Sequence, residues 1–337
     1  CDTQNLDGKT KNVGDIRLAF TSAHKMRAAM TWTFNQFPRM AKVSWHQSKV
    51  TGNFVGNPSI SDVVSKYMMA VKRRKVHAGE IATSARAIEP ELLRKLYHFN
   101  NSNERLFLRQ YAAGSSIAKH DGGRACRMMW LIYLLGLNCM LRIDEIIKMK
   151  AHHIRLHPTK SDCIIITLDY RKTHQFGGVQ PFYIWKLPRG EEHLCLYRAY
   201  AQWQAVLQGE NPLHTGYLFR KIGSGDRVNY QKDEPIASAD VLEMFRNHLI
   251  DIKVNDLPYG THSFRHGGCQ YFATQRRWSI CDICQWGGWS TEFSNLTIVR
   301  YLIGWNDNPV VDRESFFDPN CPLQIRCSNC GRTCNCA

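Results

Sequence analysis

The spacing of apolar residues along the chain is helical over most of its length and becomes strand-like in one central stretch. That stretch holds three short segments, residues 153–157, 163–170 and 179–185, and Gly177 with Gly178 marks a hairpin turn before the last of them. We therefore predict a mainly α fold with a small three-stranded antiparallel β-sheet, an α+β arrangement. Helical segments are expected at residues 16–40, 60–71, 90–99, 123–135, 142–150, 191–207, 238–252, 262–275 and 279–285.

The longest apolar run covers residues 128–141 and is too short to span a bilayer. Gly136 and Asn138 interrupt this run, so we expect a buried helix that ends there in a turn. Residues 1–20 carry scattered charge and lack the apolar core of a secretory signal. The expectation is an intracellular protein without a membrane partner, and a nuclear one if its source is eukaryotic.

A basic run at residues 73–75 is followed by a polar stretch, residues 76–88, and then by Pro90 at the start of a helix. This stretch is interpreted as a linker between two domains, and a surface loop within one domain is the alternative. We predict three parts: a smaller helical domain with its linker at 1–85, a larger domain at 86–318, and a cysteine-rich tail at 319–337. Since the chain begins at Cys1 rather than Met, the first domain could be incomplete.

The charge balance indicates a polyanionic partner. The chain has 44 Lys and Arg against 29 Asp and Glu, a net charge of +15, while the hydrophobic content of 44% is ordinary for a folded protein. Nucleic acid is the first candidate for such a partner. A basic protein with no such partner explains the charge about equally well, so the decision depends on the residues that carry chemistry.

Several charged or polar side chains stand at positions where helix packing does not require them. Taken singly, each has an ordinary explanation as a surface charge or a core aromatic. Glu145 follows Arg142 by three residues and shares its helical face, and His262 and Arg265 have the same spacing. In chain order the candidate residues are Arg142, Glu145, Lys172, His262, Arg265, Trp289 and Tyr301.

In this order the residues resemble the catalytic positions of the tyrosine recombinase family, also called phage-integrase-type recombinases, over roughly residues 86–305. The residues at 142–145 are similar to the first arginine box, and Lys172 is similar to the lysine of the family's catalytic hairpin. The residues at 262–265 match the His-x-x-Arg box, Trp289 stands where members have His or Trp, and Tyr301 stands at the nucleophile. The interval between Trp289 and Tyr301 is a few residues longer than is common, with 291–295 as the insertion.

The chemistry explains why these residue types belong together. A tyrosine hydroxyl is a weak nucleophile until its proton is removed or its anion is stabilised. Arg142 and Arg265 can neutralise the nonbridging oxygens of a phosphodiester, so no metal or other cofactor is required. His262 is the candidate to contact the phosphate or receive the tyrosine proton, and Lys172 is the candidate general acid.

The remaining candidates are supporting residues. Trp289 can offer its indole N–H to the phosphate. Glu145 is expected to orient either His262 or Arg142, and a solvent-facing helical acid is its alternative. Tyr259 and Tyr271 are weaker candidates for the nucleophile, because one precedes a glycine in a loop and the other is expected to pack within a helix.

The resemblance implies a catalytic domain of the recombinase fold, preceded by a smaller helical domain, that acts on double-stranded DNA. It implies a 3′-phosphotyrosine intermediate, strand rejoining without ATP, and a homo-oligomer that is a tetramer on DNA. The cysteine-rich tail, the insertions and Trp289 resemble eukaryotic Crypton-type mobile elements. Two alternatives stay open: a domesticated relative that binds duplex DNA without catalysis, and a type IB topoisomerase that relaxes supercoils.

The 13 cysteines are interpreted as reduced thiols or metal ligands, since an intracellular chain rarely has a disulfide framework. Cys327 and Cys330 have the spacing of a zinc knuckle, but Cys334 and Cys336 are too close together for the usual second pair. Zinc in the tail is therefore one prediction, and a disordered or truncated tail is the alternative.

Overall fold

The computed structural model describes residues 9–10, 12, 19–38, 40, 43–77, 85–102, 122–171, 179–211, 214–223, 226–289 and 298–302. The chain divides into two compact units, Cys1–Ala82 and Thr83–Ala337. The expected domain limits at residues 85 and 318 stay predictions, and the tail at 319–337 lies outside the described ranges. None of the helices in those ranges is long and apolar enough to cross a membrane.

The first unit contains two helices, α1 (Phe20–Phe34) and α2 (Asp62–His77), and between them a hairpin of β1 (His46–Gln47) and β2 (Phe54–Val55). Helix α1 is shorter than the predicted segment at 16–40, because Asn35 ends it and Pro38 follows three residues later. Helix α2 is longer than predicted, because the basic residues at 72–75 are good helix formers and favour the carboxyl end of a helix.

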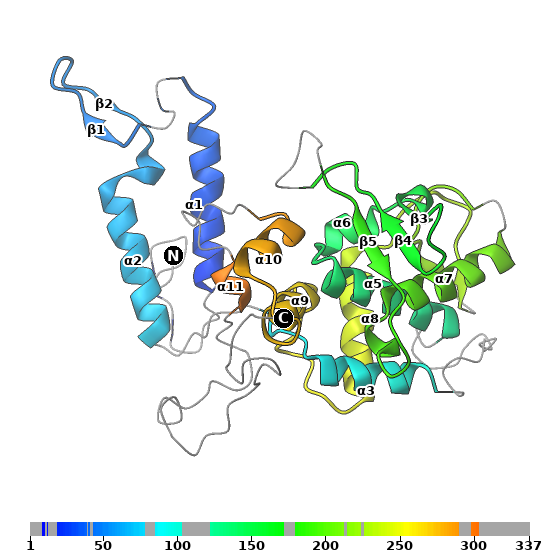
Figure 1. Ribbon diagram of the computed structural model, residues 1–337. Coiled ribbons are helices and arrows are strands. Elements are labelled where there is room, and N and C mark those ends of the chain that lie inside the picture. Colours follow the sequence, from blue (N-terminus) through cyan, green and yellow to red (C-terminus); the bar gives the residue numbers. More distant parts are fainter. Residues whose placement is uncertain are drawn as a thin grey trace, which may run out of the picture. The chain divides into compact units, whose positions relative to one another are not determined.

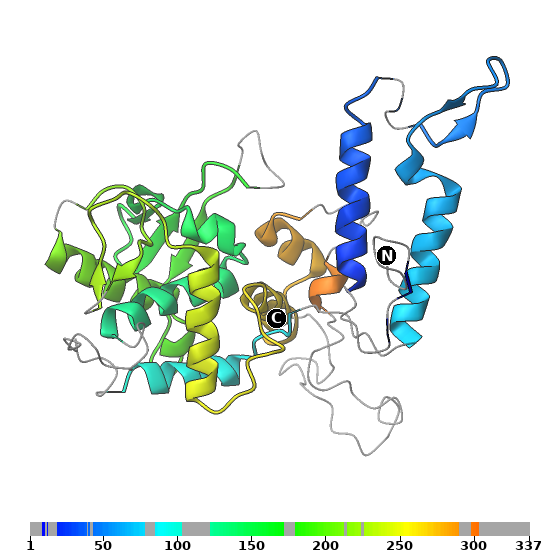
Figure 2. The same cartoon turned by 180° about the vertical axis from the view of Figure 1, so that it is seen from behind.

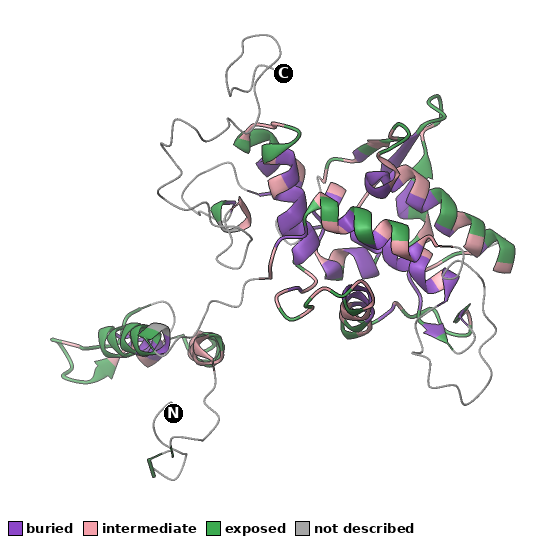
Figure 3. Ribbon diagram, turned by 90° about the horizontal axis from the view of Figure 1, so that it is seen from below, coloured by how far each residue is buried: buried purple, intermediate pink, exposed green. Residues whose placement is uncertain are grey.

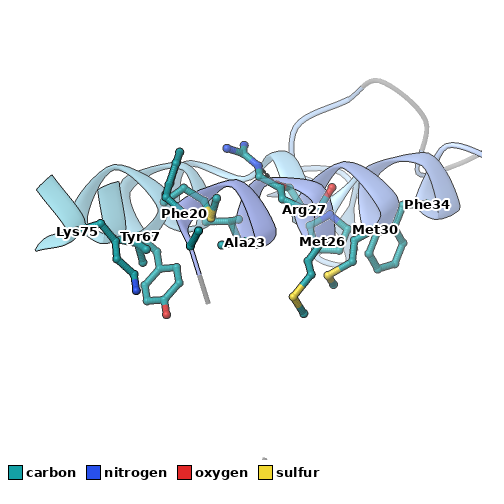
Figure 4. A pocket seen from close by; sticks show the side chains of 14 residues that line it. Phe20, Ala23, Met26, Arg27, Met30, Phe34, Tyr67 and Lys75 are labelled. Carbon is teal, nitrogen blue, oxygen red and sulfur yellow. Dashed lines mark hydrogen bonds between the residues drawn. The ribbon is translucent and has the colours of Figure 1, made fainter. Parts of the chain in front are cut away.

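The two helices of this unit border an apolar groove of about 350 Å³. Figure 4 shows the side chains of Phe20, Met26, Met30 and Phe34 from α1 in this groove, with Tyr67 from α2. Helix α1 has no fully buried residue, and its methionines are about half exposed. Among the described residues of this unit, Met68 and Val71 of α2 are buried, and α1 is joined to Ser59 by hydrogen bonds from Arg27 and with Thr31.

The second unit is built around α5 (Gly123–Asn138), in which thirteen of the sixteen residues are buried. The helices that contact it are α3 (Pro90–Asn100), α6 (Ile143–Ile147), α7 (Leu196–Glu210), α8 (Ser238–Asp251) and α9 (Ser263–Thr274). Figure 3 shows the buried residues concentrated in this unit. Seen from the front and from behind, the sheet and α8 occupy opposite faces of the unit (Figures 1 and 2).

The turn predicted at residues 136–138 is wrong, because α5 continues through them to Asn138. A Cβ on Gly136 would lie only 2.9 Å from the Cβ of Phe264 on α9. Gly268 of α9 in turn faces the carbonyl of Leu137 at a distance that leaves no room for a side chain. The glycines therefore allow two helices to pack closely, and their helix-breaking tendency is overcome by the contact.

The predicted three-stranded antiparallel sheet is confirmed. It consists of β3 (Ile154–Leu156), β4 (Cys163–Ile166) and β5 (Phe182–Trp185), in that order, with Ile154 opposite Ile166 and Ile166 opposite Phe182. All four residues of β4 are buried, so this central strand reads as a continuous apolar run. The strands are shorter than predicted, and Gly177 and Gly178 lie outside the described residues.

Two further differences concern the ends of elements. Helix α6 covers Ile143–Ile147 and not residues 142–150, because Arg142 is its N-cap and Lys148 its C-cap. The predicted helix at 191–207 divides at Cys195 into a 3-10 turn, Glu192–Leu194, and α7. The remaining described elements are α10 (Ile280–Gly287), α11 (Val299–Leu302) and two 3-10 turns, Pro58–Ile60 and Ala151–His153. The pair of β6 (Ile222–Gly223) with β7 (Arg227–Val228) was not predicted, and neither was the β1–β2 hairpin.

Candidate active site

The turn between α5 and α6 supplies a backbone oxygen on which two distant arginines converge. Met140 has a φ of 49°, a left-handed conformation that residues other than glycine adopt only where the surroundings enforce it. Its carbonyl accepts a hydrogen bond from Nη1 of Arg265 and another, at 3.5 Å, from Nη2 of Arg171. The unusual backbone conformation is thus placed where it holds two guanidinium groups.

Arg142 and Glu145 form a reciprocal pair at the start of α6. The Glu145 carboxylate accepts the Arg142 backbone N–H at 2.9 Å and its Nη1 at 3.2 Å. Arg142 is in an extended conformation before the first helical turn, so its side chain can lie beside Glu145. Of the two expected roles of Glu145, the contact to Arg142 is the one present, and the 11% exposure of the carboxylate side chain argues against a solvent-facing acid.

Helix α9 contributes His262 at its N-cap and Arg265 within its first turn. Arg265 is only 1% exposed, and besides Met140 it donates through Nη2 to the Gly287 carbonyl at 3.3 Å. Burial lowers the pKa of Arg265 to about 10, and the positive charges of Arg142 and Arg171 act in the same direction. The guanidinium is therefore charged at neutral pH but is destabilised by its surroundings, which favours an anionic partner.

His262 is exposed at the protein surface, but its ring is close to the same charges. Its pKa is lowered, first by partial desolvation and then by the Arg265 and Arg142 guanidiniums, while Asp144 opposes the shift. Because the ordinary value is near 6.5, the imidazole is mainly neutral at pH 7. A neutral ring can accept a proton, which is the role expected of His262.

Tyr301, on α11, packs against the Arg265 guanidinium. The centroid of its half-buried ring lies 5.2 Å from Cζ of Arg265, 4.9 Å from the Trp289 ring and 4.6 Å from the His266 ring. Trp289 is 7% exposed and lies 4.4 Å from the same Cζ. The guanidinium therefore contacts the faces of two aromatic rings, an arrangement that attracts cations.

The structure thus brings together six of the candidate residues in the second unit: Arg142, Glu145, His262, Arg265, Trp289 and Tyr301. Lys172 lies outside the described residues, as do the four cysteines of the predicted zinc site and the insertion at 291–295. The seven cysteines in the described ranges are free thiols.

Arg171 is the residue of this cluster that the sequence interpretation missed. It is 2% exposed and directly precedes Lys172, the residue that the sequence pattern indicates. Its Nη1 donates to the Trp286 carbonyl at 3.4 Å, and its Nη2 lies 3.8 Å from Glu145. Burial lowers its pKa, and Glu145 opposes the shift. The sequence shows only that this arginine directly follows a predicted strand. Many surface arginines have the same position, so the pattern does not distinguish a buried one.

Three buried nitrogen atoms at this site have no hydrogen-bond partner among the residues that the structure describes. They are Nε of Arg171, Nε of Arg265 and Nε1 of Trp289. All three are donors, and buried polar groups normally have partners. With three guanidiniums and the nearby carboxylates of Glu145 and Asp144, the cluster has an excess of positive charge and of donors, which is complementary to an anion with several oxygens.

Two cavities adjoin the cluster, and Arg171 lines both. One, of about 460 Å³, is also lined by Arg142, Glu145 and Lys148, and the other, of about 920 Å³, by Trp286 and Trp289 among others. The buried guanidinium of Arg171 therefore belongs to the wall that the two cavities share.

A separate group at the rim of the smaller cavity has the residue types of a metal site. His152, His153 and Asp169 have donor atoms within 4.8 Å of one another. However, Nδ1 of His153 accepts the backbone N–H of Lys150 at 3.1 Å, which leaves the proton on Nε2, the atom 3.2 Å from Asp169. A protonated Nε2 cannot bind a metal, so this histidine is suited to a hydrogen bond with Asp169.

Comparisons with known proteins give structural likeness only. No protein-family model and no curated protein matches the sequence. The chain is similar to XerH site-specific recombinase bound to its difH substrate, with 14% identity and a TM-score of 0.41 over 64% of this chain and 49% of that one, so it spans about half the length of that protein. It is also similar to the Tn1549 transposon integrase bound to circular intermediate DNA, with 13% identity and a TM-score of 0.40 over 89% and 84%.

Proposed function

We propose that the protein cleaves and rejoins double-stranded DNA, with Tyr301 as the nucleophile that becomes attached to the phosphate. The observation that carries the proposal is the position of the half-buried Tyr301 ring, 5.2 Å from the buried Arg265 guanidinium, within a cluster of unpaired donors. A phosphodiester bound to this cluster would bring its phosphorus next to a phenol and its nonbridging oxygens next to cations. The net charge of +15 supports a polyanionic substrate.

The proposed step is a transesterification. The Tyr301 oxygen forms a bond to phosphorus as the bond from phosphorus to the 5′ oxygen breaks, which leaves a 3′-phosphotyrosine and a 5′-hydroxyl. The neutral imidazole of His262 accepts the phenol proton, consistent with its lowered pKa. Lys172, in the role that the resemblance implies, gives a proton to the leaving oxygen.

The arginines stabilise charge on the nonbridging oxygens. Arg265 uses two of its five N–H groups on the Met140 and Gly287 carbonyls, so its orientation is set before a ligand binds and its remaining donors are available. Arg142 is oriented by Glu145 in the same way. Donors held in place before the reaction need no reorganisation in the transition state, which is how such groups accelerate reactions most.

Exchange of strands between two duplexes and assembly of a tetramer on DNA belong to this proposal as consequences of the family resemblance. In the reverse step, a 5′-hydroxyl from another strand attacks the phosphotyrosine and releases Tyr301. The reaction conserves the number of high-energy bonds, so no cofactor is needed. The assignment to Crypton-type elements and the zinc site in the tail stay predictions.

The decisive experiment traps the covalent intermediate. Nicked duplexes with randomised sequence around the nick lose the short 5′-hydroxyl strand after cleavage, so the protein–DNA adduct accumulates and survives detergent. We expect adduct with the wild type and none with Tyr301→Phe. The matched control is Tyr271→Phe, because Tyr271 is buried and its hydroxyl contacts Arg276 at 2.8 Å, away from the cluster.

The other outcomes separate the alternatives. An adduct that persists in Tyr301→Phe places the nucleophile elsewhere, and DNA binding without any adduct favours the non-catalytic binding protein. If the wild type forms the adduct, a supercoiled plasmid with two copies of the selected sequence distinguishes recombination of the two sites from relaxation alone, the result expected of a type IB topoisomerase.

A further inference from the structure

Arg171 is buried among groups that compensate its charge only in part, including the Phe182 ring, whose centroid lies 5.7 Å from its Cζ. Its Nη atoms donate to two backbone carbonyls, those of Trp286 and Met140, at 3.4 and 3.5 Å, and its Nε has no described partner. The one described carboxylate near it belongs to Glu145, at 3.8 Å, and is already engaged by Arg142. Such a charge costs folding free energy, so its retention needs an explanation other than stability.

The contacts of Arg171 lead to both proposed phosphate-binding arginines. Arg171 and Arg265 share an acceptor, because Nη2 of Arg171 and Nη1 of Arg265 both donate to the Met140 carbonyl oxygen. Through Glu145, Arg171 meets Arg142, which shares that carboxylate. A planar guanidinium can donate to a carbonyl and face a carboxylate at the same time through different nitrogen atoms, whereas a lysine has a single nitrogen atom for both contacts.

The backbone around Arg171 is shaped to accept it. Gly288 has a φ of 66°, and a Cβ at this position would lie 2.7 Å from Nη1 of Arg171. The Trp286 carbonyl and Gly288 stand on either side of Gly287, whose carbonyl accepts Nη2 of Arg265. The end of α10 therefore contacts both arginines, and each holds a different carbonyl of the same turn.

We propose that Arg171 is a positioning residue for phosphodiester cleavage. It holds the Met140 carbonyl and the Glu145 carboxylate so that Arg265 and Arg142 present their free donors to the nonbridging oxygens. This assignment rests on the proposed function, because Arg171 can position the two arginines for cleavage only if the protein binds and cleaves a phosphodiester. It acts through the two arginines and not through the proton donor of the leaving oxygen.

The test uses Arg171→Met and Arg171→Lys on a nicked duplex selected for adduct formation by the wild type. Methionine is close in length and apolar, and Glu145 keeps Arg142 as its partner after the substitution, so no carboxylate is left buried and unpaired. We expect Arg171→Met to lower the single-turnover cleavage rate constant on the order of 100-fold, as misplaced groups in active sites do. The DNA concentration for half-saturation should change less than about threefold and the melting temperature by only a few degrees. Arg171→Lys should recover a minor part of the rate.

The matched control is Arg220→Met. Arg220 is also buried, holds the Lys232 and Thr215 carbonyls at 3.0 and 2.9 Å, pairs with Asp233 at 2.7 Å and lies over the Tyr230 ring. Its contacts are of the same kind as those of Arg171 but do not lead to Arg265 or Arg142. We expect Arg220→Met to lower the melting temperature and leave the cleavage rate per folded molecule unchanged.

A second substrate separates the two routes by which Arg171 could act. With sulfur in place of the bridging 5′ oxygen, the leaving group departs without a proton, so a defect in proton donation is rescued and a defect at the nonbridging oxygens is not. We expect the deficit of Arg171→Met to persist on this substrate. Rescue would overturn the proposal in favour of an effect through the proton donor.

Three further outcomes decide whether the role proposed for Arg171 holds. Cleavage by Arg171→Met within about threefold of the wild type overturns the proposal, as does an equal deficit in Arg220→Met. If Arg171→Met does not fold, Arg171→Lys is judged by the same criteria. If the wild type forms no adduct, the proposed function itself fails, and this is seen before any Arg171 variant is measured.

Discussion

Helices α1 and α5 have 15 and 16 residues, but they differ in what surrounds them. Helix α1 has no fully buried residue, whereas thirteen residues of α5 are buried. The first is rich in alanine, methionine and basic residues, which form helices well without a core. The second is almost wholly apolar and is stable only inside the second unit.

The difference explains why the candidate site lies in the second unit. A guanidinium with 1% exposure and a pKa lowered to about 10 requires a rigid, water-excluding framework around it. The carbonyls that hold Arg265 belong to turns at the ends of α5 and α10, which this framework fixes. The first unit offers an apolar groove lined in part by methionines, whose side chains adapt to their surroundings, and no buried guanidinium lies among its described residues.

The largest expected effect is on the free energy of unfolding. Leu131→Ala in α5 should lower that of the second unit by about 3 kcal/mol, because Leu131 is fully buried and its removal leaves a cavity. The Met30 side chain in α1 is 53% exposed, so Met30→Ala should lower the free energy of unfolding of the first unit by less than about 0.5 kcal/mol. Urea titration followed by hydrogen exchange and mass spectrometry assigns each transition to its unit. Equal losses would remove the contrast between the units.

A smaller effect is expected at the ends of helices. Asp226 is 2% exposed and accepts the backbone N–H groups of Arg124 and Ala125 at 2.8 and 3.0 Å, at the start of α5. Asp226→Ala should lower the free energy of unfolding by about 1–2 kcal/mol. Asp226→Asn should lower it less, because the amide oxygen still accepts both hydrogen bonds and because burial already raises the pKa of this carboxyl. Thermal unfolding followed by circular dichroism measures both.

The counterpart in the first unit is Asp62, in the first turn of α2. It pairs with Lys66 at 2.6 Å, but both side chains are more than 70% exposed. Asp62→Ala should therefore leave the melting temperature unchanged within error. A loss as large as that of Asp226→Ala would show that exposed charges hold the first unit as firmly as buried caps hold the second.

The smallest effect concerns pH. His193 is 3% exposed, and burial lowers its pKa, with Arg94 acting in the same direction. Because the unfolded chain binds the proton more readily, the stability of the second unit should be complete above about pH 6.5 and fall as the pH drops through the lowered value. Melting temperatures between pH 7.5 and 5 should show this decline, and His193→Gln should make it shallower without removing it, because the pKa values of His153, His214 and His262 are lowered as well. An unchanged slope in the variant would contradict the assignment.

Much of the fold could be predicted because local patterns and tertiary contacts agree. The three strands were found from alternation and the isoleucine-rich run of β4, and α8 and α9 from their helical spacing and end residues. The extent of α5 could not be predicted, because a glycine at 136 locally indicates a turn. The close contact with Phe264, which is distant in sequence, keeps this residue in the helix. Two-residue strands such as β6 and β7 are too short for any period to be read.

For the candidate site, sequence order identified residues that the fold brings together. Arg142 lies more than a hundred residues before Arg265, and Tyr301 lies 36 residues after it, so no local pattern relates their side chains. Arg171 was missed because its importance comes from the carbonyl that it shares with Arg265, and a backbone oxygen has no signature in the sequence.

The sequence by itself determined the types of the longer elements, the basic charge and the order of residues on which the proposed chemistry rests, because these depend on side-chain identity and local spacing. The tertiary structure alone decided which of these side chains meet, how deeply Arg171 and Arg265 are buried, and that Glu145 contacts Arg142. The physical reason is that burial and backbone hydrogen bonds depend on packing between distant segments, and these two quantities set where the arginines lie and how far their charges are removed from water.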